Sequence, residues 1–294
     1  MDYFLFLLIT GIATGFVYAL LALGFVVIYK ATRVLNFAQG GLVMLGGYFC
    51  FTTLGQFGLH PLLAFSLAAI ASITIAILIE RYLLKPLIGK SLLSLVMVTI
   101  GLGSIIEGFA IALYGTDEQA MPEVLPEFAV SIGTVYIPSI YVWAIIISSI
   151  LIVALFLFFK FSNLGIVMRA VSNNQPGALS MGIRVNHIFA ISWILASLIA
   201  LAGGFILGSI SMMSPSLSIV IYPLFAAVII GGLDSIPGAL IGGLVIGVMQ
   251  LLVAGYLGDL TGASFKTVFP FLILLLVLMI KPYGLFGTHE VERL

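Results

Sequence analysis

Long apolar segments recur along most of the chain, and they constrain its fold more than any other feature. A helix that crosses a bilayer needs roughly 20 mainly apolar residues, because every backbone donor and acceptor in hydrocarbon must be paired within the segment. We therefore predict an all-α fold, a polytopic transmembrane helical bundle of about eight or nine spans. The expected spans are residues 3–29, 37–54, 61–84, 92–114, 140–159, 188–211, 219–233, 238–256 and 266–280.

The charge content excludes a water-soluble fold. Only 7% of the residues are charged, whereas an ordinary globular domain has about 25%. Eleven Lys and Arg balance eleven Asp and Glu, so no net field favours nucleic acid as a partner. The chain starts Met1, Asp2 without a basic segment, so we expect its first apolar stretch to be retained, not cleaved as a signal peptide.

The loops divide into two classes, which predicts an orientation. Cytoplasmic loops carry the excess of Lys and Arg. With nine spans and the N-terminus outside, Lys266 is the only basic residue on the outer side, and the C-terminus is cytoplasmic. The expected cytoplasmic cations are Lys30, Arg33, Arg81, Lys85, Lys90, Lys160, Arg169, Arg184, Lys281 and Arg293.

No linker or water-soluble segment interrupts the spans, so residues 1–294 are predicted to form one transmembrane domain. Its longest external loop, about 115–139, contains four acidic residues and no basic one. This loop is either a solvated connector or a docking surface for an external partner. The longest cytoplasmic loop is about 162–187.

Catalytic and metal chemistry find no support in the sequence. There is no G-x-x-x-x-G-K-[ST] loop to hold a nucleotide. His60, His187 and His289 are far apart and lack metal-ligand spacing. The spans contain no paired carboxylates. We predict no enzyme activity, no metal and no cofactor bound by this chain.

Polar residues inside the spans are candidates for lining a path for a polar solute. A carboxylate at the bilayer centre costs about 2.5 to 3.5 kcal/mol, so Glu107 should face protein or water, either paired structurally or lining the path. Asn36 and Gln39 lie beside a run of glycines, where their amides either cap an interrupted helix or line the path. With Thr99, these residues form the predicted path.

Glycines gather in an early and a late segment, both short and broken. Small residues let helix backbones approach closely, and Gly/Pro-broken segments in both halves of a transporter often mark inverted repeats around a midplane path. We expect an inverted repeat, with these positions at helix contacts or breaks: Gly40, Gly41, Gly46, Gly47, Gly231, Gly232, Pro237, Gly238, Gly242 and Gly243.

The cytoplasmic stretch from Ser162 to Ile188 is too polar to enter lipid. Gly165 is expected to end the preceding helix, and Asn173 and Asn174 to cap a short helix containing Ala178 and Met181. Such a helix is either a surface connector or a contact for a soluble motor domain.

Taken with these features, the chain resembles the permease subunits of branched-chain amino-acid ABC importers. The resemblance covers almost the whole sequence and rests on GFVYALLALGFVVIYKATRVLNFAQGG, ERYLLKPL, LGIVMRAVSNNQPGALSMGI, VIIGGLDSIPGALIGGLVIGV and KPYGLFG. It implies a permease in the bacterial or archaeal cytoplasmic membrane that works with a second related permease, two cytoplasmic ATPases that bind ATP, and an external substrate-binding protein. It also implies that the cytoplasmic loop couples to the ATPase through Arg169, Ala170, Asn173, Ala178, Gly182 and Ile183.

Alternatives remain open from the sequence alone. Members of this family also carry urea, short amides and amino acids without branched side chains. In another class, an ion-coupled secondary carrier would use Glu107 as its coupling site. A channel would need a ring of carbonyls or charges, and no filter motif is visible.

Overall fold

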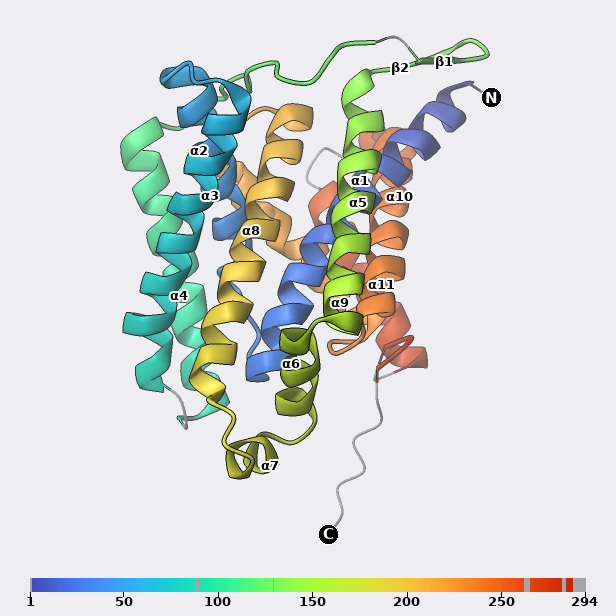
Figure 1. Cartoon of the computed structure of the whole chain (residues 1–294). Coiled ribbons are helices and arrows are strands. Elements are labelled where there is room, and N and C mark those ends of the chain that lie inside the picture. The colour runs from blue at the N-terminus through green and yellow to red at the C-terminus, as the bar shows by residue number, and fades with distance from the viewer. Residues whose placement is uncertain (1, 88–89, 129, 262–264, 282–283, 288–294) are drawn as a thin grey trace. The chain divides into compact units, whose positions relative to one another are not determined.

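Helices make up most of the described chain (Figure 1). The computed structural model describes residues 2–87, 90–128, 130–261, 265–281 and 284–287. The α-helices are α1 (Asp2–Thr32), α2 (Gln39–Phe51), α3 (Pro61–Leu78), α4 (Leu92–Tyr114), α5 (Ser139–Phe161), α6 (Asn163–Asn173), α7 (Gln175–Ser180), α8 (Val185–Ser211), α9 (Ile221–Gly231), α10 (Ile236–Thr261) and α11 (Phe265–Ile280). Short π and 3₁₀ turns extend some of them: η1 (Thr52–Gln56), η2 (Ile79–Leu84), η3 (Lys85–Leu87) and η4 (Pro215–Val220).

Among the described residues, six helices are long and apolar enough to cross a membrane. They are residues 2–32, 61–87, 93–114, 139–161, 185–211 and 236–258, and shorter apolar helices cover 215–231 and 265–280. α2 has 13 residues, about 20 Å at 1.5 Å per residue, against a hydrocarbon core of ~30 Å. The six long apolar helices make the chain an all-α, multi-pass membrane protein. The count of eight or nine spans and the inverted repeat stay predictions.

A β-hairpin is a feature that the all-α prediction missed. β1 (Val130–Ile132) pairs antiparallel with β2 (Val135–Ile137), and Ile132 faces Val135 in the register. The turn is therefore only Gly133 and Thr134, and Gly133 has φ 64°, which glycine adopts without strain. Alternating β-branched residues around a two-residue turn favour a hairpin. It lies in the loop between α4 and α5, whose bounds agree with the predicted external loop.

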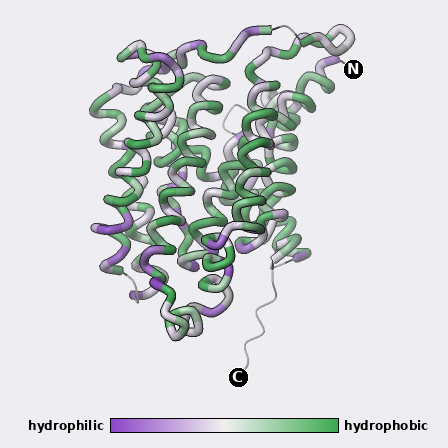
Figure 2. The backbone as a smooth tube through the Cα atoms, in the orientation of Figure 1, coloured by the Kyte–Doolittle hydropathy of each residue, from purple (hydrophilic) through white to green (hydrophobic). Residues whose placement is uncertain are grey.

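Apolar residues cover the helices along their length, and polar ones gather at helix ends and in loops (Figure 2). α3 and α4 carry large apolar side chains that are exposed in the structure, among them Leu62, Ile70, Ile105 and Phe109. A water-soluble protein would bury such side chains, whereas hydrocarbon solvates them. These exposed faces fit a lipid environment.

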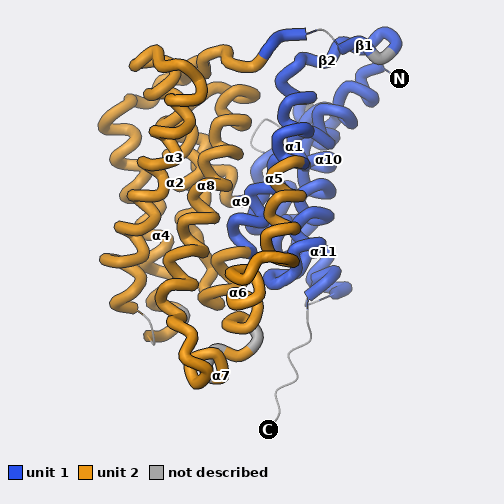
Figure 3. Tube along the Cα trace, viewed as in Figure 1, with its two compact units in different colours: residues 1–26, 126–149, 222–294 blue, residues 27–125, 150–221 orange. Residues whose placement is uncertain are grey.

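The chain divides into two compact units, each built from separate stretches of sequence (Figure 3). Unit 1 contains residues 1–26, 126–149 and 222–294, and unit 2 contains residues 27–125 and 150–221. α1 and α5 contribute residues to both units.

In unit 2, α2 is the central element. Nearly all of its residues are buried, and it packs against α3, α4, α8 and η4. Glycines allow these close contacts. A Cβ at Gly204 of α8 would collide with the Val43 carbonyl of α2, and a Cβ at Gly46 of α2 would collide with the backbone of Leu201. A helix with apolar residues on every side suits this enclosed position.

In unit 1, α10 packs closely against the first part of α1. A Cβ at Gly243 would overlap Ala19, and one at Gly247 would overlap the backbone of Gly15. The same helix approaches α9, where Gly242 lies against the Ala227 carbonyl. Small residues thus bring three helix backbones together, as expected where packing between helices must replace a hydrophobic driving force.

Candidate functional site

The break between α1 and α2 holds the predicted path residues. α1 ends at Thr32, and residues 33–38 connect it to α2. The Asn36 side-chain oxygen accepts a hydrogen bond from the Ala38 N–H at 3.1 Å, and the Gln39 N–H donates to the Asn36 carbonyl at 3.3 Å. Asn36 therefore organises the turn that starts α2. The N-cap residue of α2 is Ala38, which has no side-chain capping bond, so Asn36 shapes the turn before the helix without capping it.

Thr99 of α4 ties this turn to the neighbouring helix. Its hydroxyl oxygen accepts from the Phe37 N–H at 3.3 Å. The hydroxyl proton can go to the carbonyl of Val96, at 2.9 Å, or of Leu35, at 3.3 Å. Asn36, Gln39 and Thr99 are all fully buried. The structure brings these three predicted residues together, with Asn36 bonded to Gln39 and Thr99 bonded to the backbone on either side of Asn36, and we call them the polar cluster.

Gln39 leaves one donor of the polar cluster unpaired. Its side-chain oxygen accepts from the Asn36 amide at 3.2 Å, but its Nε2 has no hydrogen-bond partner within the described part of the chain. A buried donor left unpaired costs about 1 to 3 kcal/mol. The next residue, Gly40, lies against the Ser218 carbonyl and Ile221, so the start of α2 is tightly enclosed. The partner of this enclosed donor is therefore not among the described residues.

Glu107 lies apart from the polar cluster. It is on α4, eight residues beyond Thr99, which is about 12 Å along a helix. The side chain is half-buried, and no hydrogen bond or ion pair to it occurs among the described residues. The structural pairing considered from the sequence is therefore not provided by this part of the chain.

The stretch predicted to be cytoplasmic forms two capped helices, α6 and α7. The Ser162 hydroxyl accepts from the Gly165 N–H at 2.9 Å and begins α6. Gly165 thus lies in the first turn of α6, and the prediction that it ends the preceding helix was wrong, since α5 already ends at Phe161. The Asn174 side-chain oxygen accepts from the Gly177 N–H at 2.8 Å and caps α7, as predicted.

The predicted coupling residues differ in exposure. Arg169, Ala170 and Gly182 are exposed and Ile183 is half-buried, whereas Ala178 is only 5% exposed. Asn173 is the last residue of α6, and its side chain lies outside the described residues. Gly182 has φ 80° and ends the turn after α7.

Two large apolar side chains lie beside them: Met181, which the sequence placed in the short helix and which directly follows α7, and Leu179, which was missed. Leu179 and Met181 are 56% and 83% exposed. Their position in a polar stretch was the available signal, because exposed apolar side chains that gather into a patch mark binding surfaces. We call α6, α7 and the turn to Ile183 the coupling segment.

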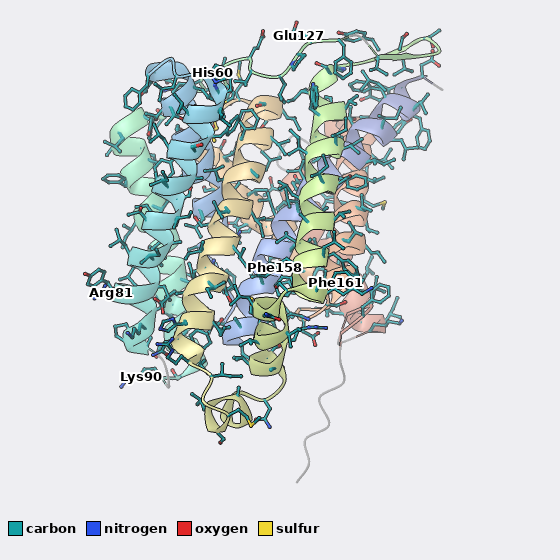
Figure 4. The ribbon with its side chains drawn as sticks, viewed as in Figure 1. His60, Arg81, Lys90, Glu127, Phe158 and Phe161 are labelled. Atoms are coloured by element: carbon teal, nitrogen blue, oxygen red, sulfur yellow. The ribbon has the colours of Figure 1, made fainter. Side chains whose placement is uncertain are left out.

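Labelled side chains mark the two ends of unit 2 (Figure 4). His60 lies at one end, and Arg81 and Lys90 lie at the other, where α6 and α7 are also found. The loop after α4 belongs to the His60 end, because Gln119 pairs with Met213 after α8 and Pro122 lies against Gly55. Residues 115–125 of the acidic loop and the coupling segment are therefore at opposite ends of this unit. Arg293, another predicted cytoplasmic cation, lies outside the described residues.

The late glycine-rich segment forms the turn between α9 and α10. Gly231 and Gly238 lie backbone to backbone, and Gly232 has φ 102°, a conformation that favours glycine. Pro237 is in the first turn of α10, where its missing N–H costs nothing. The Ser235 hydroxyl accepts from the Gly238 N–H at 3.1 Å and caps that helix. These residues hold a tight helical turn in unit 1.

The sequence profile of one family, described as the branched-chain amino acid transport system permease component, matches residues 7–278. The chain belongs to this family. The permease is 30% identical to the high-affinity branched-chain amino acid transport system permease protein BraD of Pseudomonas aeruginosa, over 97% of this chain and 96% of that protein. It is 27% identical to LivH of Escherichia coli K12, over 99% and 98%. It is 32% identical to a probable LivH of Methanocaldococcus jannaschii, over 92% and 88%.

A solved structure shares the fold of the permease. PsaBC from Streptococcus pneumoniae, in complex with Fab, superposes with a TM-score of 0.50 at 15% identity, over 96% of this chain and 93% of that one. Such low identity supports the fold alone. The family assignment therefore rests on the sequence comparisons, and it makes the chain a membrane-spanning component of a transport system.

Proposed function

We propose that the chain is the permease subunit of an ATP-driven importer that carries branched-chain amino acids across the cytoplasmic membrane. The family match covers nearly the whole chain, and the relatives named above are branched-chain amino acid permeases. The proposed partners are a second related permease, two cytoplasmic ATPases and an external substrate-binding protein. ATP is bound by the ATPases, since this sequence has no nucleotide-binding loop.

The observation that carries the proposal is the exposed coupling segment. It presents Leu179 and Met181 to solvent at the end of unit 2 where Arg81 and Lys90 lie. Cytoplasmic ends of membrane proteins carry the basic residues, so we place this end in the cytoplasm and the acidic loop outside. By the same rule the N-terminus is outside and the C-terminus is cytoplasmic. Apolar residues on a short amphipathic helix suit docking to a soluble motor domain.

Substrate passage is proposed to involve the polar cluster and Glu107. A zwitterion loses its hydration shell on entering the membrane, so polar groups or water must replace that shell. The free Nε2 of Gln39 is a donor for a carboxylate, and Glu107 is an acceptor for an ammonium group. The gap along α4 between Glu107 and Thr99 makes these successive contacts on a path, not one site.

Reconstituted uptake tests this function. We expect proteoliposomes that contain both permeases and both ATPases, supplied with ATP and binding protein, to accumulate labelled leucine, isoleucine or valine. Leaving out the ATPases should reduce uptake to the level of empty liposomes, because the proposed importer is driven by the ATP that these subunits hydrolyse. Excess unlabelled urea should not compete.

Other results would replace the proposal. ATP-independent uptake that follows a Na⁺ or H⁺ gradient would show a secondary carrier. ATP-dependent uptake of urea or a short amide, without uptake of branched-chain amino acids, would keep the importer and overturn its substrate.

A further inference from the structure

We infer that Arg33 is a positioning residue that links the coupling segment to the polar cluster; this rests on the proposed function. Arg33 is the first residue after α1. Its guanidinium Nη2 donates to the Ser172 carbonyl at 3.1 Å. Ser172 is in the last turn of α6, two residues before the Asn174 cap of α7. One side chain thus joins the α1–α2 connection to the part of the chain proposed to contact the ATPase.

The connection from Arg33 to the polar cluster is short and held at several points. Asn36 is three residues away, which is at most about 10 Å of extended chain. Between them, Val34 is buried and its N–H donates to the Thr32 hydroxyl at 3.2 Å. Beyond them, the Phe37 N–H donates to Thr99. A shift of α6 that pulls on Arg33 is therefore transmitted to Asn36 with little slack.

The backbone at Arg33 supports a role for its side chain. Arg33 has φ 56°, in the left-handed region that Gly, Asn and Asp adopt most readily. This conformation does not favour arginine, so the contacts of its side chain are the better reason for an arginine here. The guanidinium bonds to Ser172 and lies 5.9 Å from the centre of the Tyr29 ring. Tyr29 is on the last turns of α1, so the guanidinium is held from both sides.

The hydrogen bond is exposed to solvent, so it contributes little to folding. That property separates a coupling role from a structural one. Loss of a bond with a structural role would lower the amount of assembled protein. Loss of this exposed bond should instead leave assembly intact and weaken the transfer of motion.

The test uses the complete complex reconstituted with its ATPases and binding protein. Arg33→Asn removes the guanidinium while suiting the positive φ, and Arg33→Lys keeps the cation. Arg81→Asn is the matched control, because it removes another exposed cation at the same end of unit 2. For each we would measure complex yield, basal ATP hydrolysis, hydrolysis stimulated by loaded binding protein, and leucine uptake per ATP.

We expect Arg33→Asn to lower uptake per ATP at least about fivefold, the lower end of common coupling effects. Basal hydrolysis, complex yield and the binding-protein concentration for half-maximal stimulation should stay within about twofold of wild type. Arg33→Lys should retain more uptake per ATP than Arg33→Asn, and Arg81→Asn should match wild type.

Three results would overturn the inference. Unchanged uptake per ATP in Arg33→Asn would remove the coupling role, and a parallel fall in yield and basal hydrolysis would make Arg33 structural. An equal loss in Arg81→Asn would assign the effect to charge in general. If the wild-type complex itself moved no substrate with ATP, the proposed function would fail, and that result is separate from any difference among the variants.

Discussion

Gly204→Val is expected to reduce the stability of the detergent-solubilised permease strongly. A Cβ at this position of α8 would collide with the Val43 carbonyl and lie 2.8 Å from the Gly47 nitrogen of α2. Both neighbours are backbone atoms of a buried helix, so α8 and α2 must separate. Overpacking of a core typically costs about 1 to 3 kcal/mol, a factor of roughly 5 to 150 in the folded-to-unfolded ratio. The amount of monodisperse protein left after a heating series, measured by size-exclusion chromatography, reports this loss.

Gly108→Val is the matched control for this prediction. Gly108 is also inside a membrane helix, α4, but it is exposed and no atom lies within 4 Å of its Cβ position. The added side chain should enter lipid or detergent without displacing the backbone. Equal heat stability of the two variants would show that the α2–α8 contact is not as close as the structure places it.

Replacing Leu179 and Met181 together by Glu is expected to abolish ATPase binding. These side chains are the most exposed of the large apolar residues that the structure describes in the coupling segment, more exposed than Leu164 and Ile166 of α6. Interface hot spots contribute about 2 to 4 kcal/mol each, so two buried charges in their place should weaken binding by at least about 30-fold. Co-purification of the ATPases should be lost, and leucine uptake with it, while the variant is still found in the membrane fraction.

Phe57→Glu controls for a change of an exposed apolar residue to a charge. Phe57 is 65% exposed and follows η1, at the end of unit 2 opposite the coupling segment. ATPase co-purification should be unaffected by this change. Full ATPase binding and uptake in the Leu179/Met181 double variant would place the ATPase contact elsewhere.

Most helices of the fold could be predicted from the sequence, because the bilayer imposes its length on apolar segments. Each predicted segment lies on a helix in the structure. The early glycine-rich segment was predicted to be short and broken, and α2 is 13 residues long before η1. The hairpin at 130–137 was missed, since three-residue strands give too short a pattern to stand out beside strong apolar segments.

The arrangement of the candidate site was less predictable. Asn36 and Gln39 are close in sequence, so their proximity follows from the chain itself, whereas the contact with Thr99 joins positions 62 residues apart. The contact between Arg33 and Ser172 joins positions 139 residues apart. The burial of Ala178 depends on how α7 is oriented against its neighbours. A single sequence gives periodicity along one helix, but it does not show which helices meet.

Our central claim is that this chain works only as one subunit of an ATP-driven importer. Affinity purification from membranes in mild detergent tests this claim most directly. Mass spectrometry and an ATP hydrolysis assay would be applied to the purified material. We predict two ATPase subunits and a second permease in defined ratio with this chain, together with ATP hydrolysis. Recovery of the chain alone, in a form that still transports substrate after reconstitution, would contradict the claim.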